Sequence, residues 1–251
     1  MTQTRHTQTP TPAPALAIVL ARAGSKGLPQ KNMLDVAGKP MLAWTLEHAL
    51  GSASIDRVVL STDGEALADI GRQHAGVEVV LRPDELASDT ATVDAAARHA
   101  VSQIVSLHRN IVILYGNIPV RPADLTDRAV AMLNDTGADS VQSVCPVGKH
   151  HPYWMKQLGV DHQLIAYEDN AIYRRQDLPP VYELDGGIIA VTREALFNTT
   201  PGEPHAFLGN DRRAITTQPG EVIDVDHAID LHRAQAVLSQ RPAPKRKRNA
   251  G

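Results

Sequence analysis

Residues 15–32 read ALAIVLARAGSKGLPQKN, an apolar run that breaks abruptly into a loop of glycines and cations. The run at 15–21 is typical of a buried strand, because its residues are apolar almost without interruption. Glycines let the backbone turn tightly and bring its N–H groups close to a ligand, and the cations favour a negatively charged one. The stretch therefore predicts an α/β fold with an anion site after its first strand.

The loop differs in spacing from two familiar phosphate-binding loops. It matches neither the G-x-G-x-x-G of dinucleotide-binding folds nor the G-x-x-x-x-G-K-[ST] of P-loop proteins. A triphosphate suits the backbone and cations of this loop better than other common ligands do. The alternative is that the segment is only a basic surface loop between a strand and a helix. The residues that we expect to contact the ligand are Arg22, Ala23, Gly24, Ser25, Lys26, Lys31 and Asn32.

Strands and helices alternate along the rest of the chain. Apolar runs predict strands at 15–21, 56–62, 77–81, 110–115, 138–147, 186–192 and 221–226. Helical spacing of apolar residues predicts helices at 41–50, 65–75, 92–108, 129–135, 193–197 and 227–240. This order predicts a mainly parallel sheet with helices on both faces.

One folded unit accounts for most of the chain. We expect a disordered lead at 1–14, a single domain at 15–240 and a basic disordered tail at 241–251. Within the domain, residues 148–182 interrupt the alternation with HHPYW, YEDN and RRQ, which predicts an insertion that leaves the sheet.

Composition narrows the classes of partner. The 251 residues carry a net charge of −3, which gives no general attraction to nucleic acid or to a membrane surface. Apolar runs are too short to span a membrane. The single cysteine, Cys145, excludes an internal disulfide and a cysteine-only metal site, as is typical of a cytoplasmic protein.

Two acidic residues, Asp224 and Asp226, close the apolar run at 221–226. In a strand their carboxylates point to the same side, where two like charges are costly unless a cation lies between them. Oxygen ligands at this position suit Mg²⁺, which takes the rest of its shell from waters and phosphates. The alternative is that Asp226 caps the helix that follows.

A third polar segment, RPDELASDTAT at 82–92, joins a predicted strand to a predicted helix. Helix N-termini attract anions and polar ligand groups, which makes this segment a candidate for ligand contact. The alternative is ordinary helix capping by Asp89 or Thr90.

Several of these motifs occur in the same order in one known family. R-x-G-S-K-G-x-P-x-K-N, then AGKPMLAWT at 37–45, STDGEALADI at 61–70, RPDELASDTAT, HHP at 150–152 and DVD at 224–226 resemble the CMP-sialic acid synthetases, or acylneuraminate cytidylyltransferases. The resemblance covers roughly residues 15 to 240. It implies a Rossmann-like fold of the nucleotide-diphospho-sugar transferase type.

The same resemblance implies an activity: CTP reacts with a 2-keto acid sugar, of the sialic or other nonulosonic type, to give a CMP-sugar and pyrophosphate. Mg²⁺ would be held by Asp224 and Asp226, and the chain would form a homodimer through its insertion. Arg22, Lys31 and Asp226 would be catalytic, and Arg82, Thr90 and Thr92 would lie near the base and ribose. The sugar side would include Tyr115, Asn117, Arg121, Arg175, Asp185 and Gly186.

The chain departs from the family on this sugar side. Members that activate sialic acid usually carry Gln-Pro-Thr-Ser-Pro-Leu-Arg after the central strand, whereas residues 115–121 read YGNIPVR, with Tyr115 in place of the glutamine. Legionaminic, pseudaminic or eight-carbon keto acids, or another nucleotide, are therefore alternatives. Enzymes for the eight-carbon acids usually open with S-T-R-L-P-G-K, which this loop does not match. A catalytically silent regulator is a further alternative, against which the intact Arg22, Lys31, Asp224 and Asp226 argue.

Overall fold

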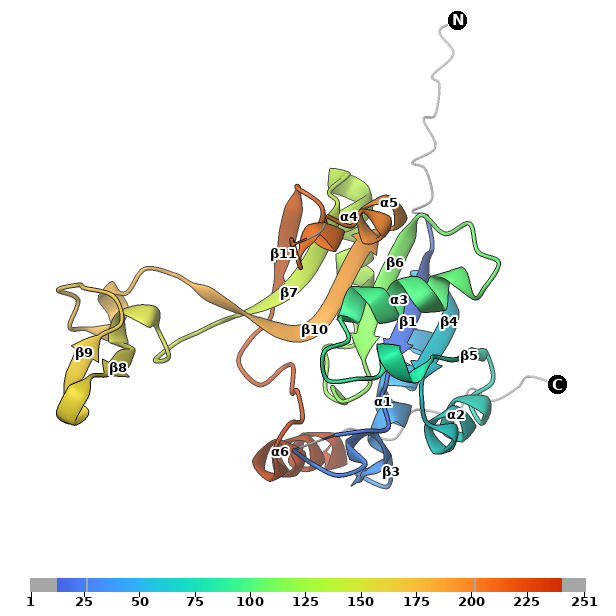
Figure 1. Ribbon diagram of the computed structural model, residues 1–251, viewed down its shortest axis with the longest axis horizontal. Coiled ribbons are helices and arrows are strands. Elements are labelled where there is room, and N and C mark those ends of the chain that lie inside the picture. Colours follow the sequence, from blue (N-terminus) through green and yellow to red (C-terminus); the bar gives the residue numbers. More distant parts are fainter. Residues whose placement is uncertain (1–12, 26, 201, 241–251) are drawn as a thin grey trace, which may run out of the picture.

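A seven-stranded sheet forms the centre of the computed structural model, which describes residues 13–25, 27–200 and 202–240 (Figure 1). Its strand order is β11-β7-β10-β6-β1-β4-β5. All neighbours run parallel except β10, which is antiparallel to β6 and β7. The predicted mainly parallel sheet is thereby confirmed. The strands are β1 (Ala15–Leu20), β4 (Ile55–Thr62), β5 (Val77–Leu81), β6 (Asn110–Tyr115), β7 (Ser140–Pro146), β10 (Tyr182–Thr192) and β11 (Arg212–Thr216).

Strand β1 shows why both faces of the sheet are covered. Its odd residues, Ala15, Ala17 and Val19, join one core cluster, and its even residues, Leu16 and Ile18, join another. Side chains alternate across a strand, so an all-apolar strand needs a cover on each side. The first cluster includes residues of α1 (Met41–Gly51), α2 (Glu65–Arg72) and α4 (Leu125–Thr136), and the second includes residues of α3 (Val93–Ser102) and α5 (Arg193–Phe197).

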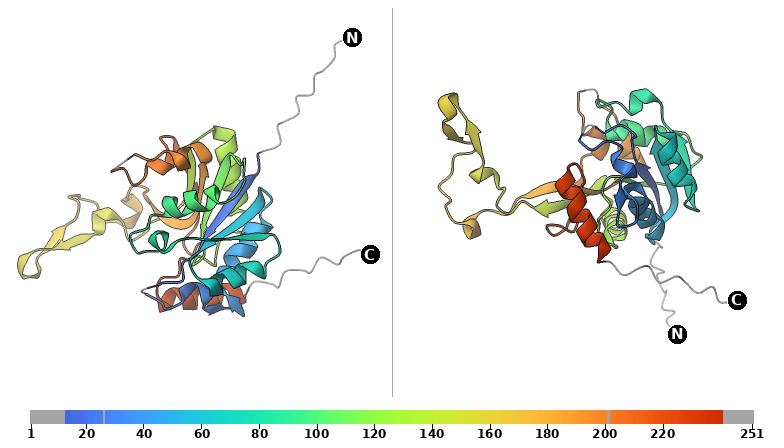
Figure 2. Two further views of the ribbon diagram at one scale, coloured as in Figure 1. Left: turned by 45° about the vertical axis from the view of Figure 1, so that its right-hand side comes forward. Right: turned by 90° about the horizontal axis from the view of Figure 1, so that it is seen from below.

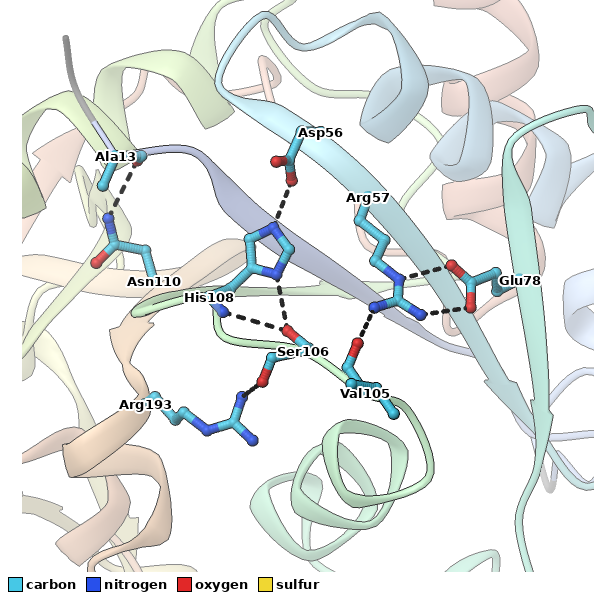
Figure 3. A network of polar contacts seen from close by, with 9 residues as sticks. All are labelled: Ala13, Asp56, Arg57, Glu78, Val105, Ser106, His108, Asn110 and Arg193. Carbon is cyan, nitrogen blue, oxygen red and sulfur yellow. Dashed lines mark hydrogen bonds and ion pairs between the residues drawn. The ribbon is translucent and has the colours of Figure 1, made fainter.

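Helix α3 ends earlier than predicted. The expected helix reached residue 108, but the chain leaves the helix after Ser102, and Leu107 is 99% exposed. Polar contacts hold the loop that follows: Arg57 donates to the Val105 carbonyl, and His108 Nε2 lies 2.6 Å from Asp56 Oδ1 (Figure 3). These contacts with the ends of neighbouring strands replace further helical turns.

The predicted strand at 221–226 is wrong. This segment makes only an isolated bridge, between Val120 and Ile223, and its backbone bonds to the loop after β6. Ile223 and Val225 are nevertheless buried, in a third core cluster, so their apolar alternation reflects packing on a loop. The true edge strand, β11, escaped prediction because its sequence, RRAIT, buries only one side chain, that of Ile215.

The last helix, α6 (Ala228–Ser239), returns to the beginning of the chain. Its Ala234 and Leu238 share the third cluster with Val36 and Met41, beside the small hairpin of β2 (Asp35–Val36) and β3 (Lys39–Pro40) (Figure 1). This packing fixes the segment at 221–226 against the opening loop.

Between β7 and β10 the chain extends away from the sheet as an arm, residues 147–181 (Figures 1 and 2). The arm carries the hairpin of β8 (Lys156–Leu158) and β9 (Leu164–Ala166). Its exposed side chains include several apolar ones, among them Leu158, Val160 and Leu164. Short 3₁₀ turns complete the fold at Lys31–Met33, Asp84–Leu86, Pro152–Trp154, Val160–His162, Arg175–Asp177 and Ala206–Leu208.

Some predictions concern residues that the structure does not describe. The predicted lead at 1–14, apart from residues 13 and 14, and the tail at 241–251 lie outside the described residues, as does Lys26. None of the described helices is both long enough and apolar enough to cross a membrane.

Candidate active site

Two clefts open beyond the carboxyl ends of the strands, the position at which open α/β sheets bind ligands. The inner cleft, of about 270 Å³, is lined by Arg22, Gly24, Ser25, Lys31, Asn32, Arg82, Ser88, Asp89, Thr92, Tyr115 and Asn117, among others. The outer cleft, of about 790 Å³, is lined by Lys149, His150, Arg175, Glu183, Asp185, Gly186, Asp224 and Arg233, among others. Most of the predicted site residues thus lie around two adjoining hollows.

The opening loop is held in place by its own backbone. Asp63, at the end of β4, accepts a hydrogen bond from the Ala23 N–H at 2.9 Å, and the Asn32 side-chain amide donates to the Arg22 carbonyl at 3.0 Å. Ala23 therefore supports the loop and is not among the residues that line the inner cleft. Asp63 stands just past the end of β4, where residues that follow different strands come together, and it supports the loop without lining the inner cleft.

Two residues that line the inner cleft each carry a buried polar atom without a hydrogen-bond partner among the described residues. Arg82 is only 8% exposed, and its Nε has no hydrogen-bond partner among the described residues; the same is true of Asn32 Oδ1. Burial lowers the pKa of Arg82, against the opposing effect of Asp63, whose Oδ1 lies 3.7 Å from Arg82 Nη2. A buried polar atom without a partner is costly. A ligand with its own donors and acceptors, such as a nucleoside, would satisfy both.

Lys31 and Asp226 meet although 195 residues separate them in the sequence. Lys31 Nζ lies 2.7 Å from Asp226 Oδ1. Gly27 lies against the Asp226 backbone so closely that a Cβ there would be 2.7 Å from the Asp226 carbonyl oxygen. The opening loop can approach this acid only because residue 27 is a glycine.

Asp224 is the member of the acid pair that lines the outer cleft. Asn117 donates its side-chain amide to Asp224, and the Asn117 carbonyl accepts from Val225 N–H at 3.0 Å. Burial raises the pKa of Asp224 to about 6, and the like charge of Asp226 adds to this rise while Lys31 and Arg121 oppose it. The pair is therefore short of positive charge, which fits a bound divalent cation. No cluster of three or more potential ligands exists in the described part of the chain, so phosphates and waters would complete the shell.

Both predicted alternatives to ligand binding named the wrong helix caps. His227, not Asp226, is the N-cap of α6, in a capping box with Asp230. Thr92 is the N-cap of α3, where it accepts from Ala95 N–H at 3.4 Å. Thr92 also lines the inner cleft, whereas Thr90 does not, and bonds instead to Ser88 Oγ at 3.2 Å.

Arg121 does not occupy the position that a substrate-binding arginine needs. It is 2% exposed, and its guanidinium donates to the carbonyls of Tyr115, Ile118 and Gly187 and to the Thr45 hydroxyl. The predicted contact with the acid sugar is therefore wrong, because the side chain is enclosed by the backbone that it supports. Burial lowers the pKa of Arg121, and the nearby carboxylates of Asp224 and Asp185 oppose this effect.

Asp185 and Gly186 mark a turn of β10 at the outer cleft. The Asp185 carboxylate accepts from Ser143, Thr217 and the Gly187 N–H, the last at 2.9 Å. Gly186 has a φ of +71°, and a Cβ there would lie 3.8 Å from Asp224 Oδ2. Asp185 is thus occupied in shaping the turn, and Gly186 brings the backbone close to the acid pair.

Tyr115 lies between the two clefts. It lines the inner cleft, and its ring lies 3.8 Å from the position that a Gly186 Cβ would take. Burial raises the pKa of Tyr115 to about 12, and the charge of Asp224 adds to the effect, so the phenol stays neutral near pH 7. The residue that departs from the resembling family thus lines the inner cleft and lies against Gly186, a residue of the outer cleft.

A protein-family model described as "Cytidylyltransferase" matches residues 16–196. The chain belongs to the cytidylyltransferase family. It is an enzyme of the nucleotidyltransferase class. The matched region contains the opening loop, Arg82 and Tyr115 but ends before the acid pair and α6.

Curated relatives agree in class and differ in the sugar named. The chain is 31% identical over 220 residues to the CMP-N,N'-diacetyllegionaminic acid synthase of Legionella pneumophila, covering 85% of this chain and 91% of that protein. It is 33% identical over 179 residues to an N-acylneuraminate cytidylyltransferase of Streptococcus agalactiae, covering 70% of this chain and 43% of the streptococcal protein.

Solved structures share the fold. A CMP:2-keto-3-deoxy-manno-octonic acid synthetase complexed with CTP has a TM-score of 0.70 at 17% identity, with 91% of this chain and 99% of that one covered. The 4-diphosphocytidyl-2C-methyl-D-erythritol synthase of Anaerococcus prevotii has a TM-score of 0.64 at 14% identity, with 92% and 100% covered. The predicted Rossmann-like nucleotidyltransferase fold is confirmed.

The buried position of Arg121 predicts a structural phenotype. Arg121→Met should lower the free energy of unfolding by about 3 kcal/mol or more, because several buried acceptors lose their charged donor. Urea denaturation measures the change, with Arg72→Met on the exposed side of α2 as the control, for which we expect about 0.5 kcal/mol or less. An unchanged stability together with weaker sugar binding would restore the substrate-contact interpretation.

The raised pKa of Asp224 predicts a pH-dependent difference between the wild type and Asp224→Asn. Well below pH 4 the carboxyl is protonated in both the folded and the unfolded wild type, so the ionisation contributes nothing to the difference. As the pH rises from about 4 to about 6, the unfolded chain ionises while the folded site still holds the proton, so the wild type loses stability relative to the variant until the folded carboxyl also ionises. In magnesium-free buffer the variant should gain stability between pH 4 and pH 7, by less than about 3 kcal/mol because solvent screens the exposed Asp224 carboxylate. Thermal melts of both proteins across this range test this, and a difference independent of pH would contradict it.

Proposed function

We propose that this enzyme transfers the cytidylyl group of CTP to a nonulosonic acid, a sugar acid of the sialic type, giving a CMP-sugar and pyrophosphate. The observation that carries the proposal is the pairing of an inner cleft lined by Arg22, Lys31 and Arg82 with an outer cleft lined by Lys149, Arg175 and Arg233, across the Asn117–Asp224 hydrogen bond. The named activities of the Legionella and streptococcal relatives support the same substrate class.

The inner cleft suits CTP. Arg22, with Lys31 on the other side of the opening loop, places positive charge where a triphosphate would lie, and Arg82 and Asn32 offer a donor and an acceptor to the base or ribose. Arg22 now pairs with Asp89 at 2.8 Å, on the half-exposed rim of the cleft. An incoming phosphate would compete with this exposed carboxylate, which costs little because exposed ion pairs are weak.

The outer cleft suits the acid sugar. Lys149, His150 and Arg175 come from the base of the arm, and Arg233 comes from α6. Neither Lys149 nor Arg175 forms an ion pair with a described residue, so the charge of each is available to a carboxylate. The sugar hydroxyl would then face the α-phosphorus at the junction beside Asp224.

Nucleotidyl transfer needs the attacking hydroxyl and the α-phosphate in line, with the growing negative charge neutralised. The oxygen of the anomeric hydroxyl bonds to the α-phosphorus as the bond to the bridging oxygen of pyrophosphate breaks, and the proton of the hydroxyl passes to water. Lys31, held by Asp226, neutralises charge on the phosphates, and Gly186 leaves room for the sugar beside Asp224. Asp224 and Asp226 would hold Mg²⁺, which when bound supplies further positive charge to the phosphates.

We also propose that the enzyme acts as a homodimer that pairs through its arm. The exposed apolar side chains of the β8–β9 hairpin, including Leu158, Val160 and Leu164, are the support for this. Light scattering after size exclusion gives the mass directly; a dimer that becomes monomeric in Leu158→Asp/Leu164→Asp supports the proposal, and a monomeric wild type refutes it.

The decisive experiment measures pyrophosphate release with each of the four nucleoside triphosphates and a panel of acid sugars: N-acetylneuraminic, legionaminic, pseudaminic and an eight-carbon keto acid. We expect at least about tenfold preference for CTP, or about 1.4 kcal/mol, and turnover with a nine-carbon acid. Equal turnover with GTP would contradict the base assignment. Absence of turnover with every acid in the panel would favour a silent regulator.

Asp226→Asn separates a charged role from a structural one. His227 provides the cap of α6 and Asp226 is largely exposed, so the melting temperature should change little. Turnover should fall about 10²-fold or more, because a charge that acts on the developing phosphate charge is lost. Asp211→Asn, which removes an exposed carboxylate on the edge of the sheet, is the control and should retain full turnover.

Lys31→Ala tests the phosphate contact. Charge-assisted contacts should strengthen as the leaving pyrophosphate gains charge, so kcat/KM for CTP should fall by about 2–4 kcal/mol. Lys31→Arg should recover only part of the loss, because a planar guanidinium does not replace a compact ammonium. Normal turnover in Lys31→Ala, with a folded protein by circular dichroism, would show that the opening loop is only a structural turn.

A further inference from the structure

Helix α6 turns a second face toward the outer cleft. Ala234 and Leu238 are buried in the third core cluster, whereas Asp230, Arg233 and Val237 line a groove between the helix and the loop at 219–224. Spacings of three and four residues place these three side chains on one side of the helix. The groove, of about 580 Å³, shares Asp224 and Arg233 with the outer cleft and continues it.

Arg233 has no ionic partner within the described part of the chain. Asp230, three residues earlier, is spaced to pair with it, but its carboxylate accepts instead from the backbone N–H groups of His227 at 3.0 Å and Asp226 at 3.3 Å. The Asp230 carboxylate therefore caps α6 and does not pair with Arg233. Arg233 thus presents an uncompensated guanidinium to a cavity that also contains Asp224.

We propose that Arg233 binds the carboxylate of the acid sugar and sets the preference of the enzyme for an acid over a neutral sugar. This inference rests on the proposed function and names a residue of its sugar site. A guanidinium binds a carboxylate through two parallel hydrogen bonds, which gives both strength and orientation. The resemblance places Arg121 and Arg175 on the sugar side, but Arg121 is enclosed in the core. Arg233 was missed because it looks like any polar residue of a surface helix.

The chemistry of a 2-keto acid sugar favours a cation in this position. Its carboxylate is bonded to the same carbon that carries the attacking hydroxyl, so the two groups must bind side by side. The hydroxyl has to reach the phosphate beside Asp224, and Arg233 lines both cavities that Asp224 lines. Arg175 approaches from the arm, where its Nη2 lies 3.5 Å from the position of a Gly148 Cβ, and it lines only the outer cleft of the two. Of the lysine and arginine side chains that line the outer cleft, Arg233 is therefore the one that belongs to the folded body and not to the arm.

The test compares Arg233→Gln with the wild type by steady-state kinetics, using the acid sugar that the wild type accepts best and its neutral C1 carboxamide. We expect the KM for the acid to rise about 10- to 100-fold while the KM for CTP stays within about twofold. The preference for acid over carboxamide should fall by a similar factor, which loss of helix stability would not produce. Arg233→Lys should restore part of the preference.

Arg72→Gln is the matched control, since Arg72 is an exposed helical arginine that lines neither cleft, and it should leave both KM values unchanged. A wild type active on an acid sugar, with Arg233→Gln unaltered in KM and in acid preference, overturns the inference and leaves the proposed function standing. A wild type inactive on every acid sugar overturns the proposed function, and the inference with it.

Discussion

The buried guanidinium of Arg121 is the interaction on which the site depends. It joins the carbonyls of Tyr115 and Ile118, at the end of β6, to the Gly187 carbonyl of β10 and the Thr45 hydroxyl of α1. Strand β10 is antiparallel to both of its neighbours, so the carboxyl end of β6 and the turn of β10 need a common support. A single side chain with several donors in one plane supplies it. Its charge also opposes the rise in the pKa of Asp224.

Burial and charge are balanced around one acid pair. Asp224 is held from the β6 side by Asn117, and Asp226 is held from the opening loop by Lys31, so the two acids belong to different halves of the site. The inner cleft reaches Lys31 and Asn117, and the outer cleft reaches Asp224 and Gly186. Two ligands bound in these hollows would meet beside the acids. This arrangement explains why polar residues scattered from 22 to 233 converge on one small region.

The strands could be predicted from sequence where burial leaves an apolar run, as in Ala15–Leu20 and Asn110–Tyr115, and the cluster of cations in the opening loop predicted the position of the site. Prediction failed where an apolar pattern served another purpose. Ile223 and Val225 alternate because they pack on a loop, and Leu107 continues a helical spacing that the chain does not follow. The roles of Arg121 and Arg233 could not be predicted, because an arginine in the core and one on a surface helix look the same until the tertiary fold places their neighbours.

The ion pair between Lys31 and Asp226 has a consequence for how the enzyme is made. The partners lie 195 residues apart, so a ribosome that has just finished the first phosphate-binding loop has nearly the whole domain still to synthesise. At about 5–20 residues per second, the loop waits roughly 10–40 seconds for the acid that completes it. During that interval Lys31 lacks its counter-charge. The site therefore cannot assemble before residue 226 has been made, and a chain released before that point has the loop but not the acid pair.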